Sequence, residues 1–452
     1  MKVFSFLIIL IVSIILSSKN ESEAFGGNNW FWDWITKKNN DRETTTAPSP
    51  VTTTTPSPVT TTTVSITEDE EMQAITNISY SINQFAFELH KAMAKKTDGS
   101  FISSPLSAAM VLMMAAYGAR DENAKKVNSL LHFDTNNRMY KTGINLLIEM
   151  FNTFDPIRFK IGNKIYAGKN QDTKSDLISL VSKIFESSIE NVDFGSSKDT
   201  MKKVNDWRAE IDHQRIRNVI ESDEISKDTE LFFINSLYFS ALWKCPFDET
   251  MTAPTNFLMN NGEVIVKPVM STLQGANSHR LPELERAANT LEFKGDINND
   301  DLMKFTLIDD SRSVNIDDLG RDLHALHLFD FKKNSDSYME MPKFRIESTI
   351  NLEDMLNDLE IITAFEKIAK TSSISKQGSE LKMNRVAQKL TFEINELGIE
   401  AAVHSEASFD NGTTTNSDPE PLEQVPIFIG NPFVFLITYN NTILFTGRFI
   451  KS

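Results

Sequence analysis

The chain has 452 residues, of which 46 are basic and 62 acidic, so its formal net charge is −16. Hydrophobic residues make up 40% of it and include 31 Phe, which is too apolar for a disordered chain and enough for a large core. The acidic balance argues against nucleic-acid or anionic-membrane binding, which needs clustered Lys and Arg. A single cysteine excludes an internal disulfide and any zinc site built from several cysteines.

Residues 1–24 have the pattern of a secretory signal peptide. One lysine precedes a mostly apolar run from Phe4 to Leu16, which is too short to span a bilayer comfortably as a helix. Ser22 and Ala24 have the small-residue spacing of a cleavage site, which predicts a cut after Ala24. The alternative is an uncleaved signal anchor. We expect a secreted, extracellular protein with no membrane attachment once the signal is removed.

Residues 25–74 are interpreted as a tail and linker. Three of the five Trp lie in the segment NNWFWDWI at 28–35, which suits either a partner-anchoring segment or a strip folded back on the body. The unit PSPVTTTT then occurs twice over 48–63, a composition typical of an extended, O-glycosylated spacer. The acidic run 68–71 ends this linker, and one large domain is expected over 75–452.

The body begins with helical patterns and ends with strand patterns. Apolar residues recur at helical spacing over 75–95, and Ser104 and Pro105 precede a wholly apolar run that predicts a buried helix ending near Gly118. Strands are expected at 231–239, 264–266, 338–346, 390–394, 433–439 and 443–449. The order predicts an α+β fold with a large, mostly antiparallel sheet.

No motif of an enzyme is present. The chain lacks G-x-S-x-G, H-E-x-x-H, a Walker loop and G-x-G-x-x-G. His324 and His327 stand three residues apart, but without a further clear ligand they do not indicate a metal site. Cys245 follows Lys244 but otherwise has apolar neighbours, so a buried, inert thiol is expected rather than a nucleophile. The sequence therefore predicts no enzyme, no metal and no cofactor.

Five segments together, in order and spacing, resemble the serpin family of protease inhibitors over about residues 75–452. They are Phe101–Ser107 with its apolar helix, Phe233–Trp243 with Pro246 and Phe247, Met341–Ile346 with the segment Leu352–Phe365, Glu396–Ala402, and Asn431–Phe435 through Leu444–Arg448. The resemblance implies helices packed on a large central sheet and an exposed reactive-centre loop. In this family a protease cuts the loop, which then inserts as a new strand and drags the acylated protease with it.

The resemblance also implies site residues. The hinge of the loop is assigned to Glu396, Gly398, Ile399, Glu400, Ala401 and Ala402, and the shutter and breach to Ser104, Ser107, Asn235, Trp243 and Gln388. Two positions depart from the family pattern. Ile399 stands where inhibitors mostly have Thr or Ser, which predicts slower insertion. Gln388 stands where the shutter usually has His, so its bond to Ser104 or Asn235 is expected to have a different geometry.

The residues after Gly398 alternate in character. Every second residue from position 399 is apolar or small (Ile399, Ala401, Val403, Ser405, Ala407, Phe409). The residues between them are mostly polar (Glu400, Ala402, His404, Glu406, Ser408, Asp410). Such alternation without proline suits a strand with one buried face, as insertion into a sheet requires. A permanently exposed edge strand would show the same pattern.

The family spacing from the hinge glycine places the scissile bond near Gly412–Thr413. The candidate scissile region is Phe409, Asp410, Asn411, Gly412 and Thr413. Counting back from Pro432 gives a position near Pro421 instead, so the loop is longer than usual on that side. Residues 390–447 contain no Lys or Arg, which argues against a trypsin-like target. A chymotrypsin-like, elastase-like or acid-preferring serine protease is the expected partner.

Sequons for N-glycosylation occur at Asn77, Asn411 and Asn440, the last in an expected hairpin turn. A glycan on Asn411 would block the expected cut. The main hypothesis is therefore a secreted, monomeric inhibitor of a non-trypsin-like serine protease. The alternative is a non-inhibitory, serpin-like carrier or interaction protein with a long acidic loop. The pairs Lys125–Lys126 and Lys202–Lys203 are expected to be solvated helix surface rather than a site for a heparin-like cofactor.

Overall fold

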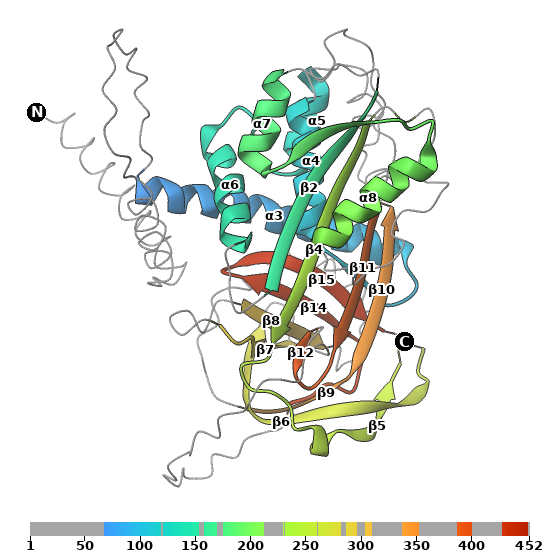
Figure 1. The fold of residues 1–452 in the computed structure, drawn as a ribbon. Helices are drawn as coiled ribbons and strands as arrows, with labels where there is room; N and C mark the ends of the chain where they lie inside the picture. The colour runs from blue at the N-terminus through green and yellow to red at the C-terminus, as the bar shows by residue number, and fades with distance from the viewer. Residues whose placement is uncertain are drawn as a thin grey trace, which may run out of the picture.

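The fold consists of helices packed around two β-sheets (Figure 1). The computed structural model describes residues 67–118, 121–152, 158–169, 175–211, 229, 231–259, 261–281, 286–295, 303–309, 337–351, 387–399 and 427–450. The signal segment, most of the linker, His324 and His327 lie outside these ranges. Within them, no helix is long and apolar enough to cross a membrane. The same ranges contain no cluster of three or more His, Cys, Asp or Glu suited to a metal ion.

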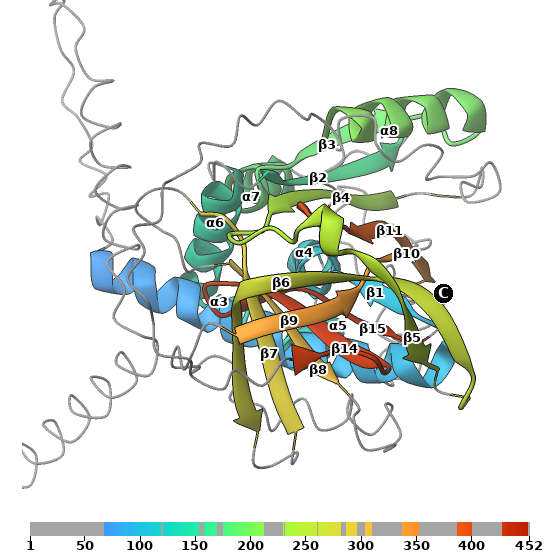
Figure 2. The same ribbon diagram turned by 90° about the horizontal axis from the view of Figure 1, so that it is seen from below.

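Most of the helices gather in the upper part of Figure 1, and α8 lies over β2 and β4. Their bounds are α3 (Glu68–Lys96), α4 (Pro105–Gly118), α5 (Asp121–Leu130), α6 (Arg138–Asn152), α7 (Ser175–Phe185) and α8 (Ser197–Ile211), with a 3₁₀ turn η1 at Glu249–Met251. Figure 2 shows α4 end-on in the middle of the molecule, and it packs against strands of both sheets. The wholly apolar sequence of α4 is explained by this position between two layers.

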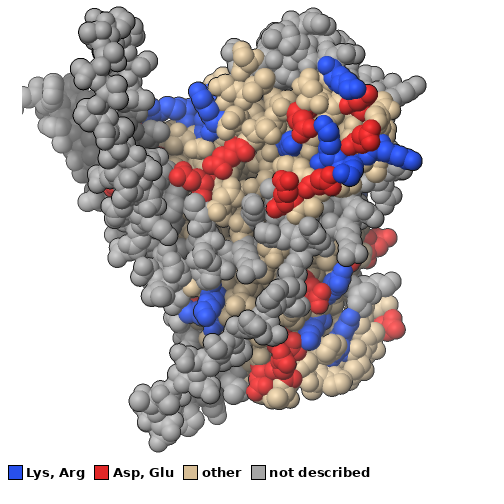
Figure 3. All heavy atoms as spheres, in the orientation of Figure 1, with Lys and Arg blue, Asp and Glu red and all other residues tan. Residues whose placement is uncertain are grey.

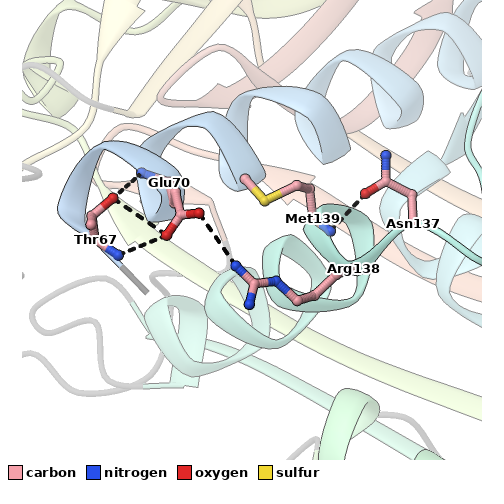
Figure 4. A network of polar contacts seen from close by, with 5 residues as sticks. All are labelled: Thr67, Glu70, Asn137, Arg138 and Met139. Atoms are coloured by element: carbon pink, nitrogen blue, oxygen red, sulfur yellow. Dashed lines mark hydrogen bonds and ion pairs between the residues drawn. The ribbon is translucent and has the colours of Figure 1, made fainter. Parts of the chain in front are cut away.

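Helix α3 begins earlier than the sequence suggested. Thr67 caps it: its Oγ1 accepts from the Glu70 N–H at 3.3 Å, while Glu70 Oε2 accepts from the Thr67 N–H at 3.0 Å. Arg138 of α6 donates to the other Glu70 oxygen at 3.3 Å (Figure 4). The acidic run 68–71 therefore forms the first turn, where carboxylates favour the helix dipole, rather than the end of the linker.

Two sheets carry the strands. The nine-stranded sheet contains β1 (Phe101–Ser103), β15 (Thr442–Phe449), β14 (Phe433–Tyr439), β8 (Met303–Asp309), β7 (Arg286–Glu292), β6 (Val264–Leu281), β9 (Ser337–Pro342) and β13 (Ile427–Phe428) in that order, with β5 (Ala253–Leu258) paired to β6. The six-stranded sheet has the order β10 (Phe344–Asn351), β11 (Ala387–Ile394), β12 (Gly398–Ile399), β4 (Leu231–Leu242), β2 (Arg158–Gly168) and β3 (Ser188–Val192). All described pairs are antiparallel except β9–β13 and β2–β3, so the expected α+β class is confirmed.

The hairpin β14–β15 forms the centre of the core, because every residue of both strands is buried. Asn440 and Asn441 join the strands with φ of 42° and 65°, a conformation typical of two-residue hairpin turns, so the expected turn at Asn440 is confirmed. The Asn83 side chain of α3 donates to the Asn441 carbonyl at 2.6 Å and accepts from the Ile443 N–H at 2.8 Å. The turn is thus held against the first helix of the domain.

Basic residues on α8 lie beside acidic ones. Lys202 Nζ is 3.2 Å from Asp206 and Lys203 Nζ is 3.0 Å from Glu190; Glu190 is half-buried and the other three side chains are exposed. Figure 3 shows blue and red side chains side by side in this upper right part of the surface. This face is therefore mixed in sign rather than a basic patch.

His90 of α3 is fully buried, and its Nδ1 lies 2.7 Å from Thr446 Oγ1. Its Nε2 has no hydrogen-bond partner in the part of the chain that the structure describes. Burial, and then the charge of Arg448, lower the pKa of His90 from 6.5 to about 3. The folded protein thus keeps His90 neutral where the unfolded chain takes up a proton.

This histidine predicts acid sensitivity. Above pH 6.5 His90 is neutral in both the folded and the unfolded chain. As the pH falls from 6.5 towards 3, the unfolded chain binds a proton there that the folded protein does not, so the folded protein progressively loses stability. At about 1.4 kcal/mol per pH unit, it makes the free energy of unfolding fall by about 2 kcal/mol between about pH 6.5 and about pH 5.

Urea unfolding of the parent and of His90→Gln at both pH values checks this prediction. The variant should lack the fall of about 2 kcal/mol that His90 causes. His132→Asn is the control, because His132 is exposed and Asn tolerates its positive φ. Equal acid sensitivity of His90→Gln and the parent would contradict the assignment.

Candidate functional site: the hinge and the gap between β11 and β4

The two-residue strand β12 lies between β11 and β4. Ile399 pairs with Ile394 of β11 on one side and with Ala241 of β4 on the other, and Gly398 pairs with Leu242. Ile399 is only 1% exposed and belongs to the main hydrophobic core. Among the described residues β11 and β4 are joined only through β12. The start of the predicted loop therefore already occupies the head of a gap between two long strands.

A tight turn leads from β11 into β12. The Asn395 side-chain oxygen accepts from the N–H groups of Leu397 and Gly398 at 3.0 and 3.1 Å, and the Asn395 N–H donates to the Gly398 carbonyl at 3.0 Å. Gly398 has a φ of 156°, and a Cβ there would lie 2.0 Å from the Ala241 carbonyl oxygen. Only glycine allows β12 to come this close to β4.

Trp243 belongs to the hinge. Its Nε1 donates to the Asn395 carbonyl and its N–H to the Leu397 carbonyl, both at 2.9 Å. Its ring stacks on Phe293 with centroids 4.7 Å apart. The sequence grouped Trp243 with the shutter and breach residues, and the structure places it at the turn before β12.

Glu396 makes a buried ionic contact beside the hinge. Lys343, which follows β9, places its Nζ 2.7 Å from Glu396 Oε2, and Thr252 donates its hydroxyl to Oε1 at 2.7 Å. Burial acts to raise the pKa of Glu396, but the hydrogen bonds from Lys343 and Thr252 outweigh it and lower the pKa overall. The carboxylate is therefore charged at neutral pH and ties the hinge turn to the nine-stranded sheet.

The shutter residues lie at the start of α4. Gln388 of β11 accepts from the Ser104 N–H at 2.9 Å and donates to the Ser104 carbonyl at 3.0 Å. Ser107 donates its hydroxyl to Asn235 of β4, whose amide donates to Asn163 of β2 at 2.8 Å. Ser104, Ser107, Asn235 and Gln388 thus lie together. Gln388 binds the Ser104 main chain, and the start of α4 bridges β11 and β4.

Three residues of this site were not predicted from the sequence: Asn163, Thr252 and Lys343. Lys343 lay inside a motif that was recognised, but no local pattern indicates that it meets Glu396, since 53 residues separate them. Asn163 could have been suspected, because a strand that is otherwise apolar on its buried face carries one amide there. Its Oδ1 accepts from Asn235, with which it is in register.

Several predicted positions lie outside the described residues. These are Glu400, Ala401 and Ala402 of the hinge and the whole candidate scissile region from Phe409 to Thr413, including the Asn411 sequon. Asn77 lies inside α3, half-buried, and accepts a hydrogen bond from Gln73 at 2.9 Å. Cys245 is half-buried rather than buried, because the chain leaves β4 just before it and carries it towards the surface, where it packs against Gly275.

Comparison with known proteins agrees with this geometry. The model of the family Serpin, serine protease inhibitor, matches residues 80–452. Ipis-1 of Ixodes persulcatus is 27% identical over 379 residues, covering 82% of this chain and 98% of its own, and human Serpin B4 is 24% identical over 409 residues, covering 83% and 99%.

Solved structures show the same fold. The structure of Serpin48 from Tenebrio molitor has a TM-score of 0.71 at 23% identity, covering 83% of this chain and 98% of its own. That of cleaved Serpin 42Da has a TM-score of 0.73 at 18% identity, covering 84% and 99%. The family match spans most of the chain, and both sheets, the hinge and the shutter lie within it. The chain therefore belongs to the serpin family of serine protease inhibitors.

Proposed function

We propose that the protein is a secreted, monomeric inhibitor that traps a serine protease of non-trypsin-like specificity when its loop is cut and inserts between β11 and β4. The observation that carries this proposal is that β12 is paired with β11 on one side and with β4 on the other. Ile399 is already paired on both sides and buried, so a cut loop has a strand start from which to extend. Each further residue that inserts would add main-chain hydrogen bonds, and every second one, from the apolar or small set, would face the core.

The specificity rests on the loop sequence. A trypsin-like enzyme pairs a basic substrate residue with a buried acid, and residues 390–447 offer no Lys or Arg. Phe409 suits a chymotrypsin-like pocket, the small residues nearby suit an elastase-like pocket, and Asp410 suits an acid-preferring enzyme. The cut is proposed near Gly412, counted from the hinge.

The test is incubation of the secreted protein with a chymotrypsin-like and an elastase-like protease over a range of ratios. A covalent complex that survives SDS is expected with one of them, and none with trypsin as the control. Asn411→Gln, made in parallel, removes any glycan from the expected cut. If the loop of both proteins is only cleaved, with no complex at any ratio, the inhibitor proposal is wrong. That result would support the carrier or interaction protein instead.

A further inference from the structure

Two of the N-glycosylation sequons meet in the core. One is Asn-Ile-Ser at 77–79 in α3, and the other is Asn-Asn-Thr at 440–442, where the hairpin turn leads into β15. The hydroxyl groups of Ser79 and Thr442, the third residues of the two sequons, are hydrogen-bonded at 2.7 Å. These two residues are 4% and 1% exposed. Although 363 residues separate them, the two sequons thus place the same functional part against each other.

A sequon needs this hydroxyl as well as its asparagine. Glycan transfer joins the asparagine side-chain nitrogen to the first carbon of the sugar. The nitrogen gives up one proton to a base of the transferase, and the lipid-linked diphosphate that carried the sugar leaves. The Ser or Thr is part of the recognised motif, so its hydroxyl must reach the transferase. Because each hydroxyl is buried against the other, packing of α3 on β15 closes both sequons in one event.

Asn77 itself remains on the outer face of α3. Gln73 and Tyr80, about one turn before and after it, are exposed, and Tyr80 is 57% exposed. Gln73 donates to Asn77 Oδ1 at 2.9 Å, which leaves the amide nitrogen at the opposite end of the side chain. No described residue accepts a hydrogen bond from that nitrogen. A glycan attached there would extend into solvent without displacing a contact of the described residues.

The second sequon is held by further contacts with α3. Asn83 donates to the Asn441 carbonyl at 2.6 Å and accepts from the Ile443 N–H at 2.8 Å. Asn440 and Asn441 have positive φ values, so the sequon is bent into the turn rather than extended. Every one of these partners lies in a helix that is made long before residue 440. The hairpin therefore finds its partners present as soon as it forms.

We infer that Asn77 carries an N-linked glycan and that Asn440 does not, given secretion of the protein, on which this inference rests as part of the proposed function. The two sequons close together but enter the secretory compartment in sequence. Ser79 stays available to the transferase until Thr442 follows it, 363 residues later. Thr442, in contrast, arrives when Ser79 is already there. The first sequon thus has a long interval for modification, and the second has only the time that docking of the hairpin takes.

The test measures glycan occupancy at each sequon of the full chain, secreted by a eukaryotic cell with the chain's own signal. An amidase that releases N-glycans converts each carrier asparagine into aspartate, so mass spectrometry of peptides reads the sites separately. We expect conversion at position 77 in most molecules and at position 440 in few. Asn77→Gln should also lower the mass of the secreted protein by one glycan.

Ser79→Ala and Asn77→Gln form a matched pair. Both lack the glycan of the first sequon, but only Ser79→Ala leaves the Thr442 hydroxyl without its partner. Loss of one hydrogen bond makes an open state about five-fold more populated, so occupancy at Asn440 should rise by up to about five-fold in Ser79→Ala. It should stay at the parental level in Asn77→Gln. The contrast between the two sites in the parent needs no variant, so it tests the inference even if Ser79→Ala is not secreted.

The outcomes separate this inference from the proposed function. Secreted protein that is unmodified at position 77, or modified equally at both positions, contradicts the inference and leaves the inhibitor proposal intact. Unchanged occupancy at Asn440 in secreted Ser79→Ala contradicts the role of the hydroxyl pair. Absence of the chain from the medium contradicts secretion, and the inference with it. Failure to trap any protease contradicts the inhibitor proposal alone.

Discussion

Ile399→Glu is expected to turn the protein from an inhibitor into a substrate. Ile399 is 1% exposed and packed in the core between β11 and β4. A carboxylate there would have to leave water without a partner or become protonated, which costs several kcal/mol. The cut loop then lacks a first residue that can enter the gap. We expect the yield of SDS-stable complex to fall at least about ten-fold, while cleavage of the loop continues.

One measurement and one control variant separate this effect from general damage. Cleavage should raise the thermal midpoint of the parent, since an added strand completes the six-stranded sheet, and should not raise that of Ile399→Glu. Glu400→Gln is the control, because neighbouring strand residues face opposite sides and the loop pattern puts position 400 on the polar side. Trapping by Ile399→Glu at the parental yield would show that burial of this residue is irrelevant to inhibition.

Glu396→Gln is expected to lower the free energy of unfolding by about 1–2 kcal/mol at neutral pH. The buried carboxylate accepts from Lys343 and Thr252, and the amide would lose the charge that pairs with Lys343. Lys343 is partly exposed and regains water, which keeps the loss below that of a fully buried pair. The hinge turn should also become looser, so that a synthetic peptide of the loop sequence adds to the gap faster.

The pH dependence gives this prediction a second readout. The pKa of Glu396 is lower in the folded protein than its usual 4.5, so its contribution is present above 4.5 and is lost as the pH falls through the lowered pKa. The stability difference between parent and variant should shrink over that range. Glu393→Gln is matched to it, because Glu393 lies on β11 and pairs with Arg345 at 3.5 Å in an exposed position. It should change stability by less than about 0.5 kcal/mol at any pH. Equal losses from both variants would contradict the special role of Glu396.

The elements that were predictable had strong local signals. The helix of α4 followed from Ser104, Pro105 and an unbroken apolar run, and the turn at Asn440 from two strand patterns separated by Asn-Asn-Thr. Strand β6 was predicted only over 264–266, but it continues to Leu281, because its later part pairs with β9 and β7 through contacts that leave no local pattern. Tertiary pairing thus outweighed local propensity.

The sequence indicated which residues belong to the site, but not which residues they contact. Motif resemblance indicated Ser104, Gln388 and Glu396, since each lies in a recognisable segment. Their partners are distant: Ser104 is 284 residues from Gln388, and Glu396 is 144 residues from Thr252. Likewise, alternation after Gly398 predicted a strand that can insert, but it could not indicate that Ile399 is already paired on both sides.

The position of the hairpin β14–β15 has a consequence for the order of events during synthesis. It lies between β1 and β8, and α3 and α4 pack against β15. The early helices therefore cannot complete their burial until residues 433–450 have left the ribosome. By then the loop segment, which comes just before this hairpin in the sequence, is already outside the ribosome. In the proposed mechanism the loop must not insert during that interval, so contacts around β12, such as those of Glu396 and the α4 bridge, would act as a kinetic barrier on the nascent chain before it meets a protease.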